Sequence, residues 1–84
     1  MPFHVYRAGD RGSRPQWFGV KVAFNEDHWV STCVELDEDG RELREADDVA
    51  PRFFGVTAGQ AHRHMVDALE NRFDEVAAVE AVHV

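Results

Sequence analysis

Three kinds of side chain in this sequence could do chemistry: five histidines, one cysteine and a dense run of acids. His62 and His64 fall on a predicted helix about 200° apart around its axis, so they cannot bind one ion together as an i, i+4 pair can. His4, His28 and His83 lie at predicted strand edges or turns, and no spacing brings them together. The histidines therefore predict no metal site, and no other pattern in the chain predicts a cofactor.

The cysteine and the acids do not predict catalysis. Cys33 alternates within a predicted strand beside Ser31 and has no neighbouring base, so we interpret it as a small packed hydrophobe. A two-metal nuclease site needs carboxylates clustered on rigid strands, whereas these acids are concentrated in a turn and a connecting loop. The run Asp37-Glu38-Asp39-Gly40 also lacks the spacing of a calcium-binding loop. We therefore expect no catalytic residues and no enzyme.

The elements that position these residues are predicted first from hydrophobic periodicity. Alternating apolar and polar residues predict strands at 3–7, 17–24 and 29–36, and a short strand is expected at 52–56. The polar stretch 25–28 has the length of a hairpin turn, so the second and third of these strands should pair antiparallel.

The next connection leaves two interpretations open. Asp39-Gly40 is a hairpin signal, and pairing outward from it sets Glu35 opposite Arg44 and Leu36 opposite Leu43. The alternative is a disordered or weakly helical acidic loop from Arg41 to Asp48, which includes residues 41–46. The sequence does not decide between strand and loop here.

The helix has a clear start. Thr57 followed three residues later by Gln60 is a capping box, in which the Thr57 hydroxyl accepts from the Gln60 amide and the Gln60 side chain reaches back to the Thr57 amide. An apolar stripe from Ala61 to Val76 predicts an amphipathic helix over about 58–75 that packs on the sheet. Alternation of Val82 and Val84 with His83 suggests a final strand.

These elements predict the fold class and domain organisation. We expect one α+β domain over residues 1–84, with an antiparallel sheet of three to five strands, one helix on one face and the order β-β-β-α-β. Trp17 and Trp29 are predicted on the face opposite the main apolar set. Together with the open edges of a small sheet, they predict burial by a second subunit, and hence a homodimer.

The charge of the chain is strongly local. Nine Lys and Arg against sixteen Asp and Glu give a net charge of −7, yet residues 25–48 alone hold ten acids and two bases. An acidic surface repels phosphate, so nucleic acid is an unlikely partner and a basic protein is favoured. We predict that the partner-binding residues, acting by steering and charge pairing, are Glu35, Asp37, Glu38, Asp39, Glu42, Glu45, Asp47 and Asp48.

The sequence also predicts where the protein resides. The chain has no apolar stretch long enough to span a membrane and no signal-like start, and a lone cysteine suits a reducing compartment. We therefore expect a cytoplasmic protein without membrane association.

One local motif carries a family resemblance. Gly55-Val56-Thr57-Ala58-Gly59-Gln60-Ala61 has the form Gly-x-Thr-x-x-Gln-Ala between a short strand and an amphipathic helix. With the aromatic-rich hairpin before it, the stretch from Trp17 to Phe73 resembles the HicB-like antitoxin domain and small stand-alone relatives of unknown function. The resemblance implies a degraded ribonuclease-H-like fold that binds and neutralises a small basic ribonuclease toxin, HicA.

Two departures from the family pattern limit what the resemblance implies. The connection from Asp37 to Arg52 is longer and more acidic than is usual in the family, and a C-terminal DNA-binding segment is not expected after residue 84. Alternatives remain: a nucleic-acid-associated module using the loop with Arg7, Arg11 and Arg14, a small ligand-binding or residual hydrolase domain, and a stand-alone domain of another role.

Overall fold

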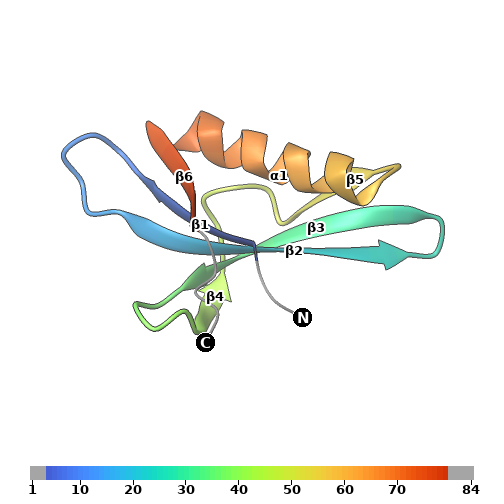
Figure 1. Ribbon diagram of the computed structural model, residues 1–84, viewed down its shortest axis with the longest axis horizontal. Helices are drawn as coiled ribbons and strands as arrows, with labels where there is room; N and C mark the ends of the chain where they lie inside the picture. The colour runs from blue at the N-terminus through green and yellow to red at the C-terminus, as the bar shows by residue number, and fades with distance from the viewer. Residues whose placement is uncertain (1–3, 80–84) are drawn as a thin grey trace.

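A computed structural model describes residues 4–79, which form one antiparallel sheet covered on one face by a helix (Figure 1). The sheet has six strands in the order β4-β3-β2-β1-β6, and β5 pairs with β3 beside β4. In chain order the elements are β1 (His4–Gly9), β2 (Gln16–Asn25), β3 (His28–Leu36), β4 (Glu42–Glu45), β5 (Arg52–Gly55), α1 (Ala58–Arg72) and β6 (Glu75–Val79).

The predicted α+β class with one helix on an antiparallel sheet is confirmed, but the predicted order is wrong. Five strands precede the helix, which gives β-β-β-β-β-α-β, and the sheet has one strand more than the upper limit of the prediction. The short strand expected at 52–56 is β5, and β4 lies in the segment left open between strand and loop; each has only four residues, and both pair with β3. Strands this short carry little periodicity of their own.

The helix ends three residues earlier than predicted. Phe73 is extended, at φ −118° and ψ 149°, while its N–H donates to the Leu69 carbonyl at 2.9 Å. From Glu75 onward the chain pairs with β1, so Val76 belongs to a strand and not to the helical stripe. The strand predicted at 82–84 lies outside the described residues.

Residues 42–45, in the segment that the sequence left open, form the strand β4 and not an acidic loop. The register of β4 against β3 differs from the prediction. Glu35 pairs with Arg44 as expected, but Leu36 pairs with Glu42 because the register shifts there by one residue. The Asp37 carboxylate accepts the N–H groups of Asp39 (2.9 Å) and Arg41 (2.8 Å). This capped turn is longer than the predicted two-residue turn and leaves Leu43 out of the pair with Leu36.

The core lies between the sheet and the helix. Phe18 and Val20 of β2 and Cys33 of β3 face the helix and are buried with Met65 and Leu69 of α1. Burial of such apolar side chains is the main favourable term in folding. The β4 hairpin projects on the other side of the sheet, away from the helix (Figure 1).

The predicted placement of the two tryptophans on one face is wrong. Trp17 pairs with Leu36, whereas Trp29 pairs with Phe24. Side chains alternate along a strand, so these two pairs lie on opposite faces, and Trp29 shares the helix side with Phe18. The pair of tryptophans therefore no longer supports a dimer interface on that face.

Candidate functional site

The predicted partner-binding acids lie on β3, on β4 and in the loops beside them, and half of them are engaged within the chain. Glu35 Oε1 lies 3.9 Å from Arg44 Nε, Glu42 Oε2 lies 3.6 Å from Lys21 Nζ, and Asp48 Oδ1 lies 3.6 Å from Arg72 Nη2. Asp37 caps the turn with its carboxylate. These four side chains hold the hairpin and its loop in place, so they are less available to a partner.

The other four acids are free to meet a partner. Glu38, Asp39, Glu45 and Asp47 are exposed, and their carboxylates form no ion pair or hydrogen bond within residues 4–79. Leu43 on β4 lies between them in the sequence and is 50% exposed. We call these four acids and Leu43 the acidic hairpin surface. It combines unneutralised negative charge with one large apolar side chain.

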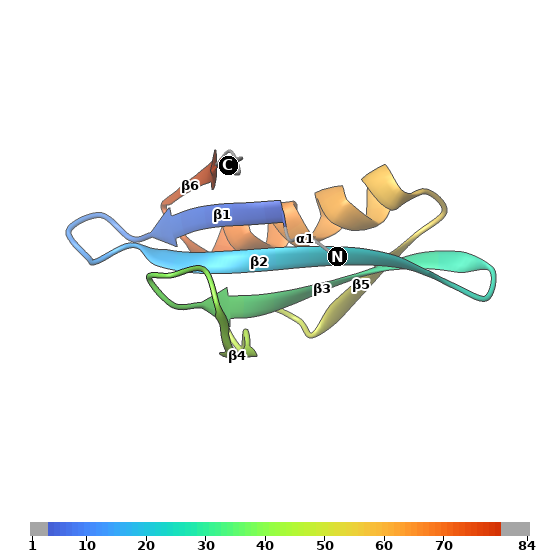
Figure 2. The same cartoon turned by 60° about the horizontal axis from the view of Figure 1, so that its bottom comes forward.

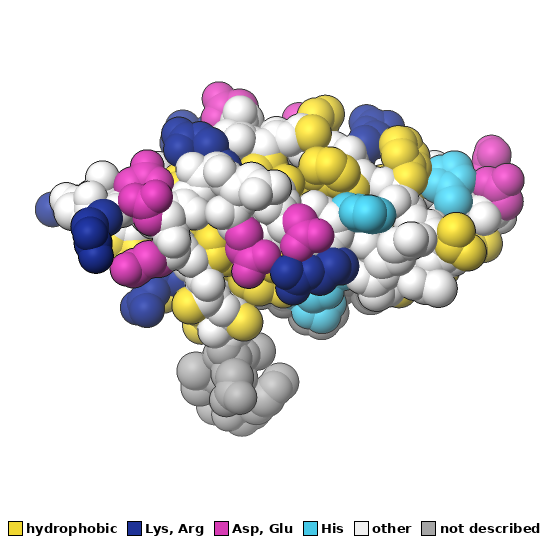
Figure 3. Space-filling model, turned by 90° about the horizontal axis from the view of Figure 1, so that it is seen from above, with side chains coloured by type: hydrophobic (Ala, Val, Ile, Leu, Met, Phe, Trp, Pro, Cys, Tyr) yellow, Lys and Arg dark blue, Asp and Glu magenta, His cyan; other side chains and the backbone are white. Residues whose placement is uncertain are grey.

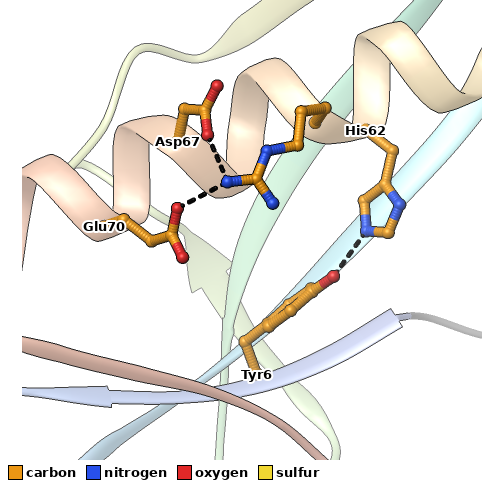
Figure 4. Close-up of polar contacts among 5 residues, drawn as sticks. Tyr6, His62, Asp67 and Glu70 are labelled. Atoms are coloured by element: carbon orange, nitrogen blue, oxygen red, sulfur yellow. Dashed lines mark hydrogen bonds and ion pairs between the residues drawn. The ribbon is translucent and has the colours of Figure 1, made fainter.

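A second cluster joins β1 to the helix (Figure 4). A hydrogen bond of 2.7 Å connects the Tyr6 hydroxyl oxygen to His62 Nε2, and the His4 ring stacks on His62 with a centroid distance of 4.3 Å. Burial lowers the pKa of His62, and the neighbouring His4 and Arg63 lower it further. Burial also raises the pKa of Tyr6. Both side chains are therefore held in their neutral forms.

A shallow groove of about 340 Å³ runs beside this cluster, between α1 and β6. Val66, Val76 and Ala78 give it an apolar lining. Arg63 at its rim is already paired, since its Nη2 lies 2.7 Å from Asp67 Oδ1 and 2.8 Å from Glu70 Oε1 (Figure 4). With its cation neutralised, the groove is poorly suited to an anion.

Sequence reasoning missed this cluster because Tyr6 and His62 are 56 positions apart. The signals that could have found it are the position of Tyr6 on an alternating strand and that of His62 near the apolar stripe of the helix. Among residues 4–79, no group of three or more His, Cys, Asp and Glu side chains is arranged to hold a metal ion.

Apolar side chains also gather at the tip of the β2–β3 hairpin. Phe24 is 58% exposed and packs edge-on against Trp29, while Phe54 is 54% exposed and packs edge-on against His28. Val56 lies beside them. In the view from the helix side, hydrophobic, histidine and acidic side chains meet at the right-hand end, over this tip (Figure 3).

The remaining sequence candidates have local structural roles. Burial raises the pKa of the Cys33 thiol to about 12, and Asp48 adds to the shift, so Cys33 is a packing residue and not a nucleophile. In the arginine-containing loop, the Arg11 N–H donates to Asp74 Oδ2 at 3.0 Å, and Asp10 also accepts from the Asp74 N–H. Both hydrogen bonds tie the loop to Asp74, between α1 and β6, and neither involves an arginine side chain.

The Gly-x-Thr-x-x-Gln-Ala motif builds the start of the helix. Thr57 is the N-cap, and the Gln60 N–H donates to its Oγ1 at 3.0 Å. The Gln60 side chain differs from the prediction, because its Oε1 accepts from the Val56 N–H at 2.7 Å and not from Thr57. A Cβ on Gly55 would stand 2.5 Å from the Ala61 nitrogen, so the motif also permits a close approach of β5 to the helix.

Comparisons with family models, with curated proteins and with solved structures find no match to this chain. Within the part of the chain that the structure describes, no helix has the length and apolar character needed to cross a bilayer.

Proposed function

We propose that this chain is a non-enzymatic protein-binding domain whose acidic hairpin surface binds a basic protein. The observation that carries the proposal is that Glu38, Asp39, Glu45 and Asp47, which flank the exposed Leu43 in sequence on and beside β4, are exposed and form no ion pair or hydrogen bond within residues 4–79. Unpaired carboxylates attract and orient a cationic protein at a distance, and a central apolar side chain supplies contact that excludes water.

The fold supports this role by fixing the hairpin. Arg44 and Lys21 hold Glu35 and Glu42, and the Asp37 carboxylate fixes the turn between the two strands. A surface ordered before binding loses less conformational entropy when the partner arrives. The paired acids thus position the unpaired ones.

The specific form we propose is a HicB-like antitoxin that neutralises a small basic ribonuclease toxin. Its support is the motif from Gly55 to Ala61 and the antiparallel sheet with one helix across it, although five strands and not three precede the helix. Neutralisation needs only that the acidic hairpin surface covers basic residues with which such a toxin holds RNA. No catalytic group of this chain takes part.

The test is co-expression with a HicA-like ribonuclease, followed by gel filtration of the complex and an RNA-cleavage assay. We expect the parent chain to co-elute with the toxin and inhibit it. The double substitution Glu45→Lys and Asp47→Lys should weaken binding by at least about tenfold at low salt. Leu43→Ala should also weaken binding, and this weakening should depend less on salt concentration than that of the double variant, because it removes an apolar contact and not a charge.

The matched control is Glu26→Lys with Asp27→Lys, which changes the net charge equally but at exposed acids of the β2–β3 turn, outside the acidic hairpin surface. The control should bind like the parent. Equal weakening by both double variants would overturn the assigned surface. Capture of an oligo-lysine peptide by the parent, without inhibition of the toxin, would keep the binding role and refute the antitoxin form.

A further inference from the structure

The outer edge of β6 is the least protected strand edge in the described part of the chain. Among the strands of residues 4–79, β6 pairs only with β1 and ends the sheet. Proteins protect such edges with charge, proline or short strands, because open N–H and C=O groups invite another strand. The opposite edge follows this rule, since it is shared by β4 and β5, which have only four residues each, and three residues of β4 are charged.

The sequence of β6 has little of this protection. Its single charged residue is Glu75, and the residues that follow are Val76, Ala77, Ala78 and Val79. Ala77 and Ala78 are exposed. The small side chains leave the backbone accessible, and nothing along the strand after Glu75 repels an incoming strand.

The charges beside this edge are balanced. Arg7 on β1 pairs in register with Ala77, so Arg7, Ala77 and Glu75 lie on the same face of the sheet. Neither Arg7 nor Glu75 forms an ion pair within residues 4–79. The edge therefore presents one free cation and one free anion.

We propose that a second copy of this chain adds its β6 antiparallel to this edge, about a twofold axis through Ala77. In that register Glu75 lies opposite Val79 of the second copy, and Val76 lies opposite Ala78. An antiparallel strand is its own complement under a twofold axis, as a closed dimer requires. Glu75 and Arg7 of the second copy then lie on the same face of the combined sheet, one strand beyond the new pair of strands, so their attraction across the axis acts at long range and is weak.

The distribution of charge selects a second copy over a basic partner at this edge. Residues 25–48 carry a net charge of −8, whereas the rest of the chain carries +1. β4 and β6 lie at opposite edges of the sheet (Figure 2). Two copies therefore meet through their nearly neutral sides, and both acidic hairpins stay at the outer ends of one continuous sheet. The inference does not depend on the proposed function.

The size of the contact sets the expected affinity. A five-residue strand covers less surface than the roughly 800 Å² per partner of a standard interface, so we expect a dimer that dissociates in the micromolar range. Sedimentation velocity from about 1 to about 200 μM should show monomer converting to dimer across that range. A monomer at every concentration would overturn the proposal.

The substitution Ala77→Lys tests the register. It places two lysines opposite each other at the twofold axis, and we expect the dissociation constant to rise at least about tenfold. The control Leu43→Lys adds the same charge to β4 at the other edge and should leave dimerisation unchanged. Thermal unfolding of both variants checks that the monomer remains folded. A dimer that resists Ala77→Lys would refute this interface.

A covalent test does not depend on weakening the dimer. Ala77→Cys places two thiols across the axis, and mild oxidation should give a disulfide-linked dimer, because directly opposed residues have the spacing that a disulfide needs. Leu43→Cys and the parent, whose Cys33 is buried, should remain monomeric on a non-reducing gel. Equal cross-linking of the two cysteine variants would contradict a specific β6 contact.

Discussion

At the scale of single residues, the fold makes protonation of His62 unfavourable. Its ring is partly buried between Tyr6 and His4, with Arg63 as the next residue of the helix. A positive charge at this place would lose water and meet other cationic groups, which is why the pKa of His62 is lowered. The folded protein therefore prefers the neutral imidazole, which keeps its hydrogen bond to Tyr6.

This preference predicts a loss of stability at mildly acidic pH. Between the ordinary histidine pKa of about 6.5 and the lower pKa of folded His62, the unfolded chain binds a proton that the folded chain does not. The free energy of unfolding should thus fall as pH falls through this window. Urea unfolding at several pH values measures it. His62→Gln, which removes the titrating ring, should reduce the dependence. Identical slopes for the parent and His62→Gln would contradict this account.

At the scale of elements, the junction of β5 with α1 explains a whole motif. The strand passes so close to the first turn of the helix that Gly55 lies against the backbone of Ala61, and Ala61 is itself fully buried. Thr57 and Gln60 then satisfy N–H groups at the helix start. Gly55, Thr57, Gln60 and Ala61 together allow β5 to pass close to the first turn of α1. The fold therefore explains the motif, whatever the chain binds.

Two glycines of this junction should respond oppositely to alanine. Gly55→Ala forces a Cβ to within 2.5 Å of the Ala61 nitrogen and should destabilise the fold by about 1–3 kcal/mol. Gly59→Ala adds a methyl group in the helix, where the nearest atom is Thr57 Oγ1 at 4.0 Å, and should stabilise by about 0.5–1 kcal/mol. Chemical denaturation of both variants measures the difference. Similar changes in the free energy of unfolding for the two variants would show that the close approach of Gly55 to Ala61 does not restrict the residue at position 55.

The long elements could be predicted because their periodicity is local. The strands expected at 17–24 and 29–36 match β2 and β3 to within a residue at either end, since alternation extends along both. The helix start was found because Thr57 caps it. By contrast, Val76 fits both a helical stripe and a strand, and only its pairing with β1 decides. Such a pairing is a long-range contact that local patterns do not contain.

Relations between elements were harder to predict for the same reason. Each strand's alternation was right, but whether Trp17 and Trp29 share a face depends on the register across the turn. The turn of β2 into β3 has only Glu26 and Asp27 between paired residues, and Glu26 adopts φ 62°. The Leu36–Leu43 pair failed because the Asp37 carboxylate builds a longer turn. A side chain thus set a register that residue types alone left open.

At the scale of the whole molecule, the sequence predicts where the negative charge lies but not which acids are paired within the chain. All eight predicted acids do lie on or beside the β3–β4 hairpin, at one edge of the sheet (Figure 2). Which of them are paired depends on Lys21 of β2, Arg44 of β4 and Arg72 of α1, which the fold brings from separate elements. The remaining unpaired acids repel one another, since no cation of the described residues pairs with them.

This repulsion predicts that the acidic hairpin surface costs stability. Glu45→Lys with Asp47→Lys should raise the thermal unfolding midpoint by about 2–4 °C at low ionic strength, because it replaces like charges with opposite ones. The gain should shrink toward zero near 1 M salt, where the Debye length is only about 3 Å. Glu26→Lys with Asp27→Lys should give a smaller gain, since those acids lie in the β2–β3 turn and not on the β3–β4 hairpin. The same double variant that weakens partner binding would then stabilise the free domain, as expected where charge is retained for binding and not for folding. A midpoint that falls at low salt would show instead that these acids stabilise the monomer.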